Sequence, residues 1–301
     1  MRISAKKPRP RPIFALCAPY PEAQPQEAEV RVRTSILAFV LAAVSTIAGA
    51  QDSGLTSLET TDAGRSWLAV GRLDIDGTGF CTGALIAPDL VLTAAHCLYD
   101  KTTGQRIDPA RIEFLAGWRR GRASAYRRVA RAVHHPDYLY EGAVTAERVR
   151  NDLALLKLSQ PIRNTTVVPF ETGNRPMRGD AVQVVSYAHD RAEAPSLQEA
   201  CAVMARQQGV LVMSCDVDFG ASGSPVFSLS DSTPRIVSVV SAKAEVDGAR
   251  VALGTSLDDT LTFLMGELDS HKRAEIPTVP RVNRLSASGQ GSASGAKFVR
   301  P

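Results

Sequence analysis

Between residues 67 and 268 the chain consists of short runs of Val, Ile, Leu, Phe and Thr separated by Gly, Pro, Asp and Asn. This texture predicts many short strands joined by turns rather than long helices. Helical spacing of apolar residues occurs in the stretch 256–268. Its apolar positions are Leu257, Leu261, Phe263, Leu264 and Leu268. We therefore expect an all-β fold that is closed by a C-terminal helix.

The predicted strands divide into two groups of six around a link at residues 171–178. The first group comprises residues 66–75, 79–86, 90–94, 112–116, 126–133 and 153–158. The second group comprises residues 182–187, 199–205, 210–214, 225–228, 235–244 and 250–255. The sequence has no internal repeat, but its strand spacing is consistent with two similar barrels, at about 66–170 and about 179–268.

An export signal is predicted near the start of the chain. Arg31 and Arg33 precede an apolar run at 36–47, which ends in the small residues Ala48-Gly49-Ala50 that a signal peptidase recognises. The run is shorter than the ~20 residues that span a membrane. We expect a secreted or periplasmic protein with no stable membrane insertion after signal removal. Because residues 1–29 would be an unusually long lead-in, we hypothesise that translation begins near Val30 or Val32 from a non-AUG codon.

The two ends of the chain differ in charge from the part between them. Residues 51–269 carry 22 basic and 27 acidic groups, so the net charge of +4 comes from the ends. This balance argues against a basic face for nucleic acid. We also expect a monomer. Polar residues 51–65 predict a loose segment, either the mature N-terminus or a short propeptide. Residues 269–301 alternate Lys and Arg with Pro, Ser and Gly, which predicts a disordered basic tail.

Four of the five cysteines lie beyond the predicted signal, an even number that predicts two disulfides in an exported protein. Of the three possible connectivities we favour Cys81–Cys97 and Cys201–Cys215. Each would close a short loop of about 15 to 17 residues, worth roughly 3 kcal/mol. The alternative use of these thiols is a zinc site, but His96 beside Cys97 is the one histidine near a cysteine pair. We therefore expect no metal and no cofactor.

Residues 220–225 read G-A-S-G-S-P and place glycines on both sides of Ser222. If Ser222 is a nucleophile, the chain must also supply a base, an orienting acid and an oxyanion site. The small neighbours would let the backbone N–H groups of Gly220 and Ser222 approach a substrate carbonyl. An isolated stretch of this kind fits a surface turn equally well, so the prediction depends on finding the partners.

Two further stretches supply candidate partners. Residues 92–97 read L-T-A-A-H-C, and residues 151–158 read N-D-L-A-L-L-K-L. Together with the stretch around Ser222 they resemble the histidine, aspartate and serine boxes of the chymotrypsin-like (trypsin-fold) serine proteases. His96, Asp152 and Ser222 follow the family's chain order with gaps of 56 and 70 residues. Asp137 is the rival acid, but it lacks the apolar strand that follows Asp152. We read His134 and His135 as surface turn residues.

The resemblance implies two six-stranded antiparallel Greek-key barrels packed side by side with a C-terminal helix, within residues 66–268. It implies that Ser222 attacks an acyl carbon, that His96 moves the proton and that Asp152 orients the imidazole. The backbone N–H groups of Gly220 and Ser222 would form the oxyanion hole. We expect a serine endopeptidase acting on proteins or peptides. The alternative is a catalytically silent binding module of the same fold at the cell envelope, which the retained triad argues against.

Departures from the family concern activation. Animal digestive members insert a new N-terminus that pairs with an aspartate immediately before the nucleophile, and this chain has Ala221 there. That ion pair cannot form, so we expect activity without it. The G-S-P ending and Cys215, seven residues before Ser222, are more similar to the bacterial glutamyl-endopeptidase branch.

Specificity remains open at this level. Asp216 lies six residues before Ser222, where trypsin-like members place a carboxylate for Arg or Lys, although it is equally consistent with a structural hydrogen bond. Asp218 adds a second acidic group. Glutamyl specificity relies on a histidine and a threonine, where this chain has Val217 and the stretch from Ser241 to Lys243. Lys243 is the candidate for attracting an acidic side chain.

Overall fold

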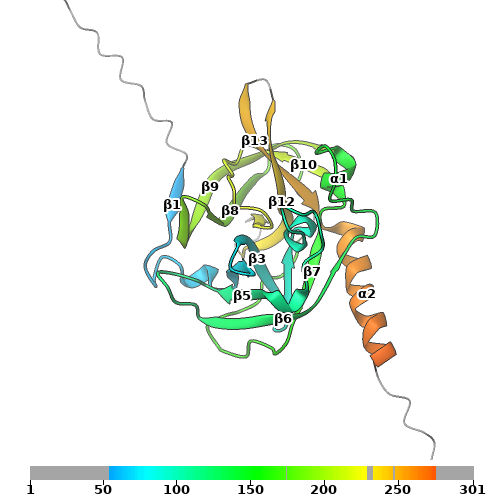
Figure 1. Ribbon diagram of the computed structural model, residues 1–301. Coiled ribbons are helices and arrows are strands. Elements are labelled where there is room, and N and C mark those ends of the chain that lie inside the picture. Colours follow the sequence, from blue (N-terminus) through cyan, green and yellow to red (C-terminus); the bar gives the residue numbers. More distant parts are fainter. Residues whose placement is uncertain (1–53, 174, 229–232, 247, 276–301) are drawn as a thin grey trace, which may run out of the picture. The chain divides into compact units, whose positions relative to one another are not determined.

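Six short strands form a closed antiparallel barrel in the first half of the computed structural model, which describes residues 54–275 apart from 174, 229–232 and 247 (Figure 1). The strands are β2 (Val70–Ile75), β3 (Gly79–Ala87), β4 (Leu90–Thr93), β5 (Ile112–Ala116), β6 (Ala125–His134) and β7 (Ala154–Leu158). They close in the order β2-β3-β4-β7-β6-β5. The turn between β2 and β3 follows directly from the sequence, because Asp76 and Gly77 adopt φ angles of 53° and 67°. Two positive φ values are what a tight Asp-Gly hairpin requires.

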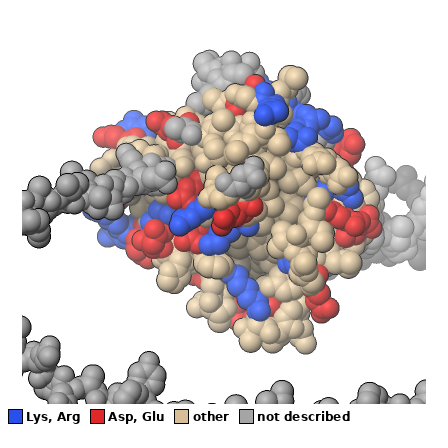
Figure 2. Space-filling view, turned by 90° about the horizontal axis from the view of Figure 1, so that it is seen from above, with Lys and Arg blue, Asp and Glu red and all other residues tan. Residues whose placement is uncertain are grey.

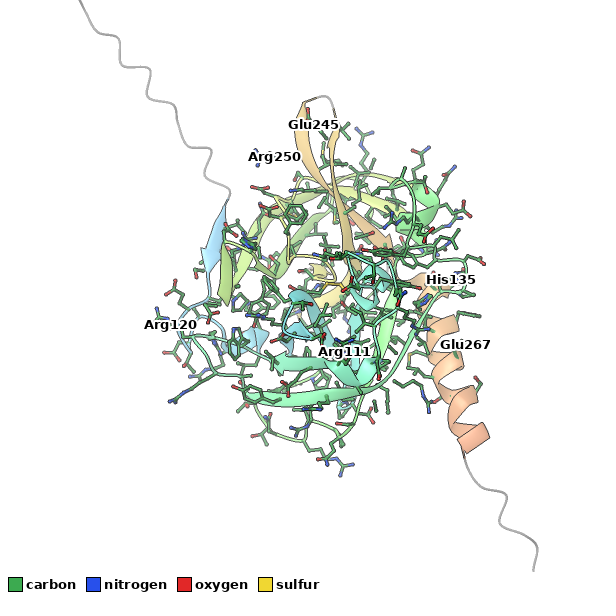
Figure 3. The ribbon with its side chains drawn as sticks, in the orientation of Figure 1. Arg111, Arg120, His135, Glu245, Arg250 and Glu267 are labelled. Atoms are coloured by element: carbon green, nitrogen blue, oxygen red, sulfur yellow. A yellow bond between two sulfur atoms is a disulfide. The ribbon has the colours of Figure 1, made fainter. Side chains whose placement is uncertain are left out.

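A second ring of six antiparallel strands follows, with order β9-β10-β13-β12-β11-β8 and a β8–β9 pairing that closes it. The strands are β8 (Ala181–Ala188), β9 (Arg191–Gln207), β10 (Val210–Met213), β11 (Pro225–Ser228), β12 (Arg235–Val246) and β13 (Ala249–Ser256). In Figure 3 the hairpin of β12 and β13 projects from the barrel. Glu245 and Arg250 lie near its tip and are opposite one another in the strand register. The predicted all-β fold of two six-stranded barrels is confirmed.

The structure differs from the expectation at three places. Strand β9 begins at Arg191, whereas we predicted a strand from 199. It continues through Pro195, and the prediction began later because a proline argues against a strand when read from sequence. The segment expected to be loose contains β1 (Leu55–Ser57), which pairs antiparallel with β9. Leu58, immediately after β1, is buried in the core. The remaining elements missed from sequence are short: η1 (Arg65–Trp67), η2 (Ala95–Leu98), η3 (Pro109–Arg111) and α1 (Ala146–Arg150).

The C-terminal helix α2 (Asp258–Glu275) packs against β6 and β7 of the first barrel. Leu264 and Leu268 are buried there, as the helical spacing predicts. The helix continues to residue 275, beyond the apolar periodicity that defined the prediction. Within the residues that the structure describes, no helix is long and apolar enough to cross a membrane. The predicted signal peptide, the hypothesised start and residues 276–301 of the predicted tail lie outside the described residues.

Aromatic side chains from both halves of the chain pack together where the barrels meet. The ring of Phe227 lies 4.9 Å from that of Trp67 and 4.7 Å from that of Phe170, measured between centroids. One core cluster contains residues of both barrels, for example Phe114 of the first and Tyr187 and Ile236 of the second. On the face seen in Figure 2, basic and acidic side chains are interleaved. The shared core fixes the relative position of the two barrels and therefore of the loops at their junction.

Candidate active site

His96 and Asp152 come from two parts of the first barrel and meet in the structure. His96 lies in η2, directly after β4, and Asp152 lies between α1 and β7. The Nδ1 atom of His96 is 2.7 Å from Oδ2 of Asp152. A carboxylate can only accept, so Nδ1 donates, and in the neutral ring Nε2 is left with a free lone pair. The backbone N–H of His96 also donates to Oδ1 of Asp152 at 2.8 Å.

Asp152 is 3% exposed, and hydrogen bonds satisfy its carboxylate. A third donor is the hydroxyl of Ser241 in β12, whose Oγ lies 2.5 Å from Oδ2. Burying a carboxylate costs several kcal/mol unless such partners replace water. The sequence placed Ser241 near the specificity pocket. The structure places it on Asp152 as well, a contact between barrels that no local motif reveals.

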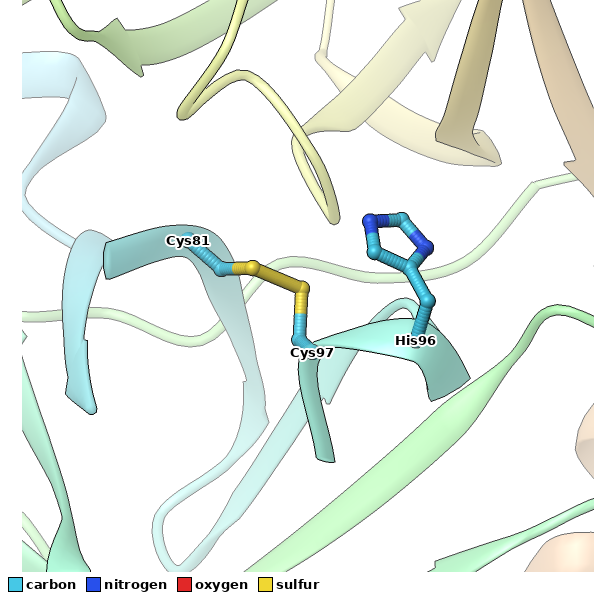
Figure 4. A group of neighbouring side chains, drawn as sticks. All are labelled: Cys81, His96 and Cys97. Atoms are coloured by element: carbon cyan, nitrogen blue, oxygen red, sulfur yellow. A yellow bond between two sulfur atoms is a disulfide. The ribbon is translucent and has the colours of Figure 1, made fainter. Parts of the chain in front are cut away.

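A disulfide holds the segment that carries His96. Cys97 in η2 is bonded to Cys81 in β3, and Cys201 is bonded to Cys215, which is the pairing that we predicted. Figure 4 shows the imidazole of His96 beside the first of these bonds. The sulfur atoms and a ring nitrogen of His96 lie within 4.8 Å of one another. Because both sulfurs are used in the disulfide, they are not thiolate ligands for a metal.

The turn that carries Ser222 lies against the strand that leads to His96. A Cβ on Gly223 would be 2.1 Å from Oγ1 of Thr93 and 3.0 Å from the backbone N of Ala94. Glycine is therefore required for this close approach, and its φ of 78° also favours it. The carbonyl of Ser222 accepts a hydrogen bond from the N–H of Thr82 at 2.8 Å. The turn therefore packs against the segment that leads to His96, and Ser222 is partly exposed.

Two backbone N–H groups of this turn have no acceptor among the described residues, those of Gly220 and Ser222. Their neighbours fix their direction. The carbonyl of Phe219 accepts from the N–H of His189 at 2.7 Å, and the carbonyl of Ala221 accepts from the N–H of Ser224 at 3.1 Å. In a trans peptide the N–H points opposite to the carbonyl. Both free N–H groups are therefore oriented before any ligand arrives.

Next to Ser222 the structure has a pocket of about 140 Å³. Its apolar walls are Val217, Val240 and Ala242. The rest of its lining consists of Asp218, Phe219, Ser222, Ser241 and Lys243. Lys243 donates to Oδ1 of Asp218 at 2.8 Å. This hydrogen bond and the charge of Lys243 hold the pKa of Asp218 below its usual value.

Asp216 does not line that pocket. It lines a neighbouring cavity of about 490 Å³, together with Arg191 and Arg250. Its backbone N–H donates to the side-chain oxygen of Gln198 at 2.9 Å. Of the four residues that we predicted for the pocket, Asp218, Ser241 and Lys243 line the pocket beside Ser222. Asp216 lines the adjoining cavity, which shares Asp218 and Lys243 with that pocket.

His134 is more than a turn residue. It ends β6, and its Nδ1 lies 2.9 Å from the carbonyl of His135, so Nδ1 carries the proton. Its Nε2 then accepts from the hydroxyl of Tyr99 at 2.9 Å. Burial lowers the pKa of His134, and the charge of Arg106 adds to this effect. His135 instead contacts the ring of Phe263 in α2, the helix beside which Figure 3 labels it.

Two antiparallel six-stranded barrels with this histidine, aspartate and serine at their junction define the chymotrypsin-like class of proteins. Comparison with known sequences agrees. A sequence model of the family described as trypsin matches residues 59–256, about two thirds of the chain. This chain therefore belongs to the trypsin family.

The similar proteins include a bacterial and a mammalian protease. Glutamyl endopeptidase of Bacillus licheniformis is 28% identical over 155 residues, which cover 51% of this chain and 47% of that protein. Serine protease 23 of Mus musculus is 30% identical over 164 residues, which cover 49% of this chain and 42% of that protein. The chain thus spans less than half the length of these relatives.

One solved structure, described as Glu endopeptidase in complex with MPD, has a TM-score of 0.60 at 19% identity. The matched region covers 73% of this chain and 98% of the chain in that structure. This likeness supports the fold.

Proposed function

We propose that this chain is a serine endopeptidase that cleaves peptide bonds through an acyl-enzyme intermediate. The observation that carries the proposal is the 2.7 Å contact between Nδ1 of His96 and the buried carboxylate of Asp152. It leaves Nε2 of His96 as a base at the junction where Ser222 lies. A serine hydroxyl needs such a base to become a nucleophile at neutral pH.

The reaction divides into two halves. Ser222 Oγ attacks the scissile carbonyl carbon while His96 Nε2 takes its proton, and His96 then returns the proton to the leaving amine. In the second half, water attacks the acyl carbon while His96 Nε2 takes its proton, and His96 then returns the proton to Ser222 Oγ. The product with the new carboxyl terminus is released. Asp152 holds the imidazole in the productive tautomer and stabilises its positive charge, a role that its three hydrogen bonds support.

The free N–H groups of Gly220 and Ser222 would bind the oxygen that becomes negative in the tetrahedral intermediate. Donors that are already oriented cost no reorganisation during the reaction, and removing one such donor typically costs about 3–4 kcal/mol in barrier height. The hydrogen bonds of Phe219 and Ala221 carbonyls supply that orientation.

Activation needs no ion pair in this proposal. Ala221 is fully buried and has no carboxylate to receive a new N-terminus. We propose that the exported protein is active once its signal is removed. The pairing of β1 with β9 and the burial of Leu58 favour a mature chain that retains residues 54–58 over one in which they are a discarded propeptide. The two disulfides are consistent with a secreted or periplasmic location.

A fluorophosphonate probe tests the proposal directly, because it reacts with an activated serine. Wild-type protein should be labelled at Ser222, whereas Ser222→Ala and His96→Ala should not. Ser228→Ala serves as the matched serine control and should be labelled like wild type. A folded wild-type protein that resists labelling would instead favour a silent binding module.

A further inference from the structure

We propose that the pocket beside Ser222 selects substrates with a small or medium-sized apolar side chain before the scissile bond, rather than Arg, Lys or Glu. This inference rests on the proposed function, since the pocket receives that side chain only if Ser222 is the nucleophile.

The inner walls of the pocket are apolar. Val217 and Val240 are buried side chains of the second barrel, and Ala242 adds a third apolar wall. A charged substrate side chain placed against these walls would lose its water without gaining a hydrogen-bonding partner, which is costly. An apolar side chain would instead gain by leaving water.

The charges at the pocket are already paired with each other. Nζ of Lys243 lies 2.8 Å from Oδ1 of Asp218 and 4.4 Å from the ring centroid of Phe219. Asp218 also accepts from the backbone N–H of Phe219 at 2.8 Å. A glutamate in the substrate would compete with Asp218 for Lys243, and an arginine would compete with Lys243 for Asp218.

No other described residue of the lining supplies a charge. Asp216, which would receive Arg or Lys in a trypsin-like pocket, lines the neighbouring cavity instead. Val217 has no hydroxyl with which to bind a carboxylate, and the hydroxyl of Ser241 in the lining already donates to Asp152. The pocket is therefore built neither for a basic nor for an acidic side chain.

The size of the pocket suits a small or medium-sized side chain. An apolar protein cavity of roughly 150 Å³ accommodates benzene, and this pocket measures about 140 Å³. Side chains from Ala to Leu or Phe fit that space.

The test is a set of tetrapeptide coumarin amides that differ only in the residue before the scissile bond: Ala, Val, Leu, Phe, Glu or Arg. The concentration of active protein is fixed by titration with the fluorophosphonate. We expect kcat/KM for the best apolar amide to exceed that for Glu and Arg at least tenfold. A labelled protein that prefers Glu or Arg, or cleaves none of the six, overturns the inference but not the proposed nucleophile. A folded protein that is neither labelled nor active overturns the proposed function itself.

Variants of the exposed ion pair give a second test that does not disturb the core. In Lys243→Met, Asp218 is uncovered, and the ratio of Arg to Leu cleavage should rise at least fivefold. The double variant Lys243→Met with Asp218→Asn should return this ratio toward that of the wild type. If Lys243 selects acidic substrates, Lys243→Met would chiefly lower Glu cleavage, and that result would contradict the proposal.

Discussion

The side-chain hydroxyl of Thr82 donates to the carbonyl of Gly220 at 2.9 Å, which joins β3 of the first barrel to the Ser222 turn of the second. The backbone N–H of the same Thr82 donates to the carbonyl of Ser222 at 2.8 Å. Thr82 is completely buried, and its Oγ1 also accepts from the N–H of Tyr187 at 3.1 Å. One residue therefore holds both ends of the turn that carries the candidate nucleophile.

Replacing Thr82 with valine tests this positioning role. Thr82→Val keeps the shape but leaves the Gly220 carbonyl without its donor and the Tyr187 N–H without its acceptor. Each buried group left unpaired costs about 1–3 kcal/mol. We expect kcat to fall about tenfold or more with KM changed less than twofold, because the turn carries the proposed oxyanion donors. Thr82→Ser keeps the hydroxyl and should restore most of kcat. A purely structural role would lower the melting temperature and leave kcat per titrated active site unchanged.

Gly223 offers a second test, of the close approach between the turn and the His96 strand. In Gly223→Ala the new Cβ would collide with Oγ1 of Thr93 and with the carbonyl of Thr82, at 2.1 and 2.4 Å. We expect fluorophosphonate labelling to be lost. Gly121→Ala is the matched control, since Gly121 has a similar φ of 82° but open space around its Cβ. It should cost about 1–2 kcal/mol of stability and leave labelling intact. Equal labelling of both variants would refute the close approach.

The strands and the three candidate residues could be predicted because their signals are local. Short apolar runs between turn residues mark the strands, and His96, Asp152 and Ser222 each lie in a short characteristic stretch. Thr82 gave no such signal, and the sequence indicated Ser241 for the pocket but not for its contact with Asp152. The roles of Thr82 and Ser241 arise from hydrogen bonds across the barrel junction. The bond from Thr82 to Gly220 joins residues that are 138 positions apart, and the bond from Ser241 to Asp152 joins residues that are 89 positions apart.

Two other features escaped prediction for different reasons. Strand β1 has three residues, of which two are exposed, and it forms because the edge of β9 offers it hydrogen bonds. The position of Asp216 depends on the path of the loop before Ser222, and counting residues back from the serine does not determine that path.

Leu58 tests whether the segment after β1 is part of the fold. Leu58 is 3% exposed, so Leu58→Ala should lower the free energy of unfolding by about 2–5 kcal/mol. Leu139, at 72% exposure, is the matched control, and Leu139→Ala should change it by less than about 0.5 kcal/mol. Chemical denaturation of both variants provides the measurement. A loose N-terminal segment would make the two substitutions equally mild.

His134 predicts how stability depends on pH. Burial and the charge of Arg106 lower its pKa in the folded state, although the His135 carbonyl and the charge of Asp152 act in the opposite direction. In the unfolded chain the pKa of a histidine is about 6.5. As the pH falls below that value, the unfolded chain binds the proton first, so stability decreases until the pH reaches the folded-state pKa.

Protonation of His134 would also end its ability to accept from the hydroxyl of Tyr99. We therefore expect the melting temperature of His134→Gln to fall less between pH 7.5 and 5.5 than that of the wild type. His135→Gln removes the adjacent histidine side chain, which does not contact Tyr99. Its melting temperature should fall between pH 7.5 and 5.5 by as much as that of the wild type. The prediction is wrong if His134→Gln and the wild type lose stability in parallel over this range, because the acid sensitivity would then come from other groups.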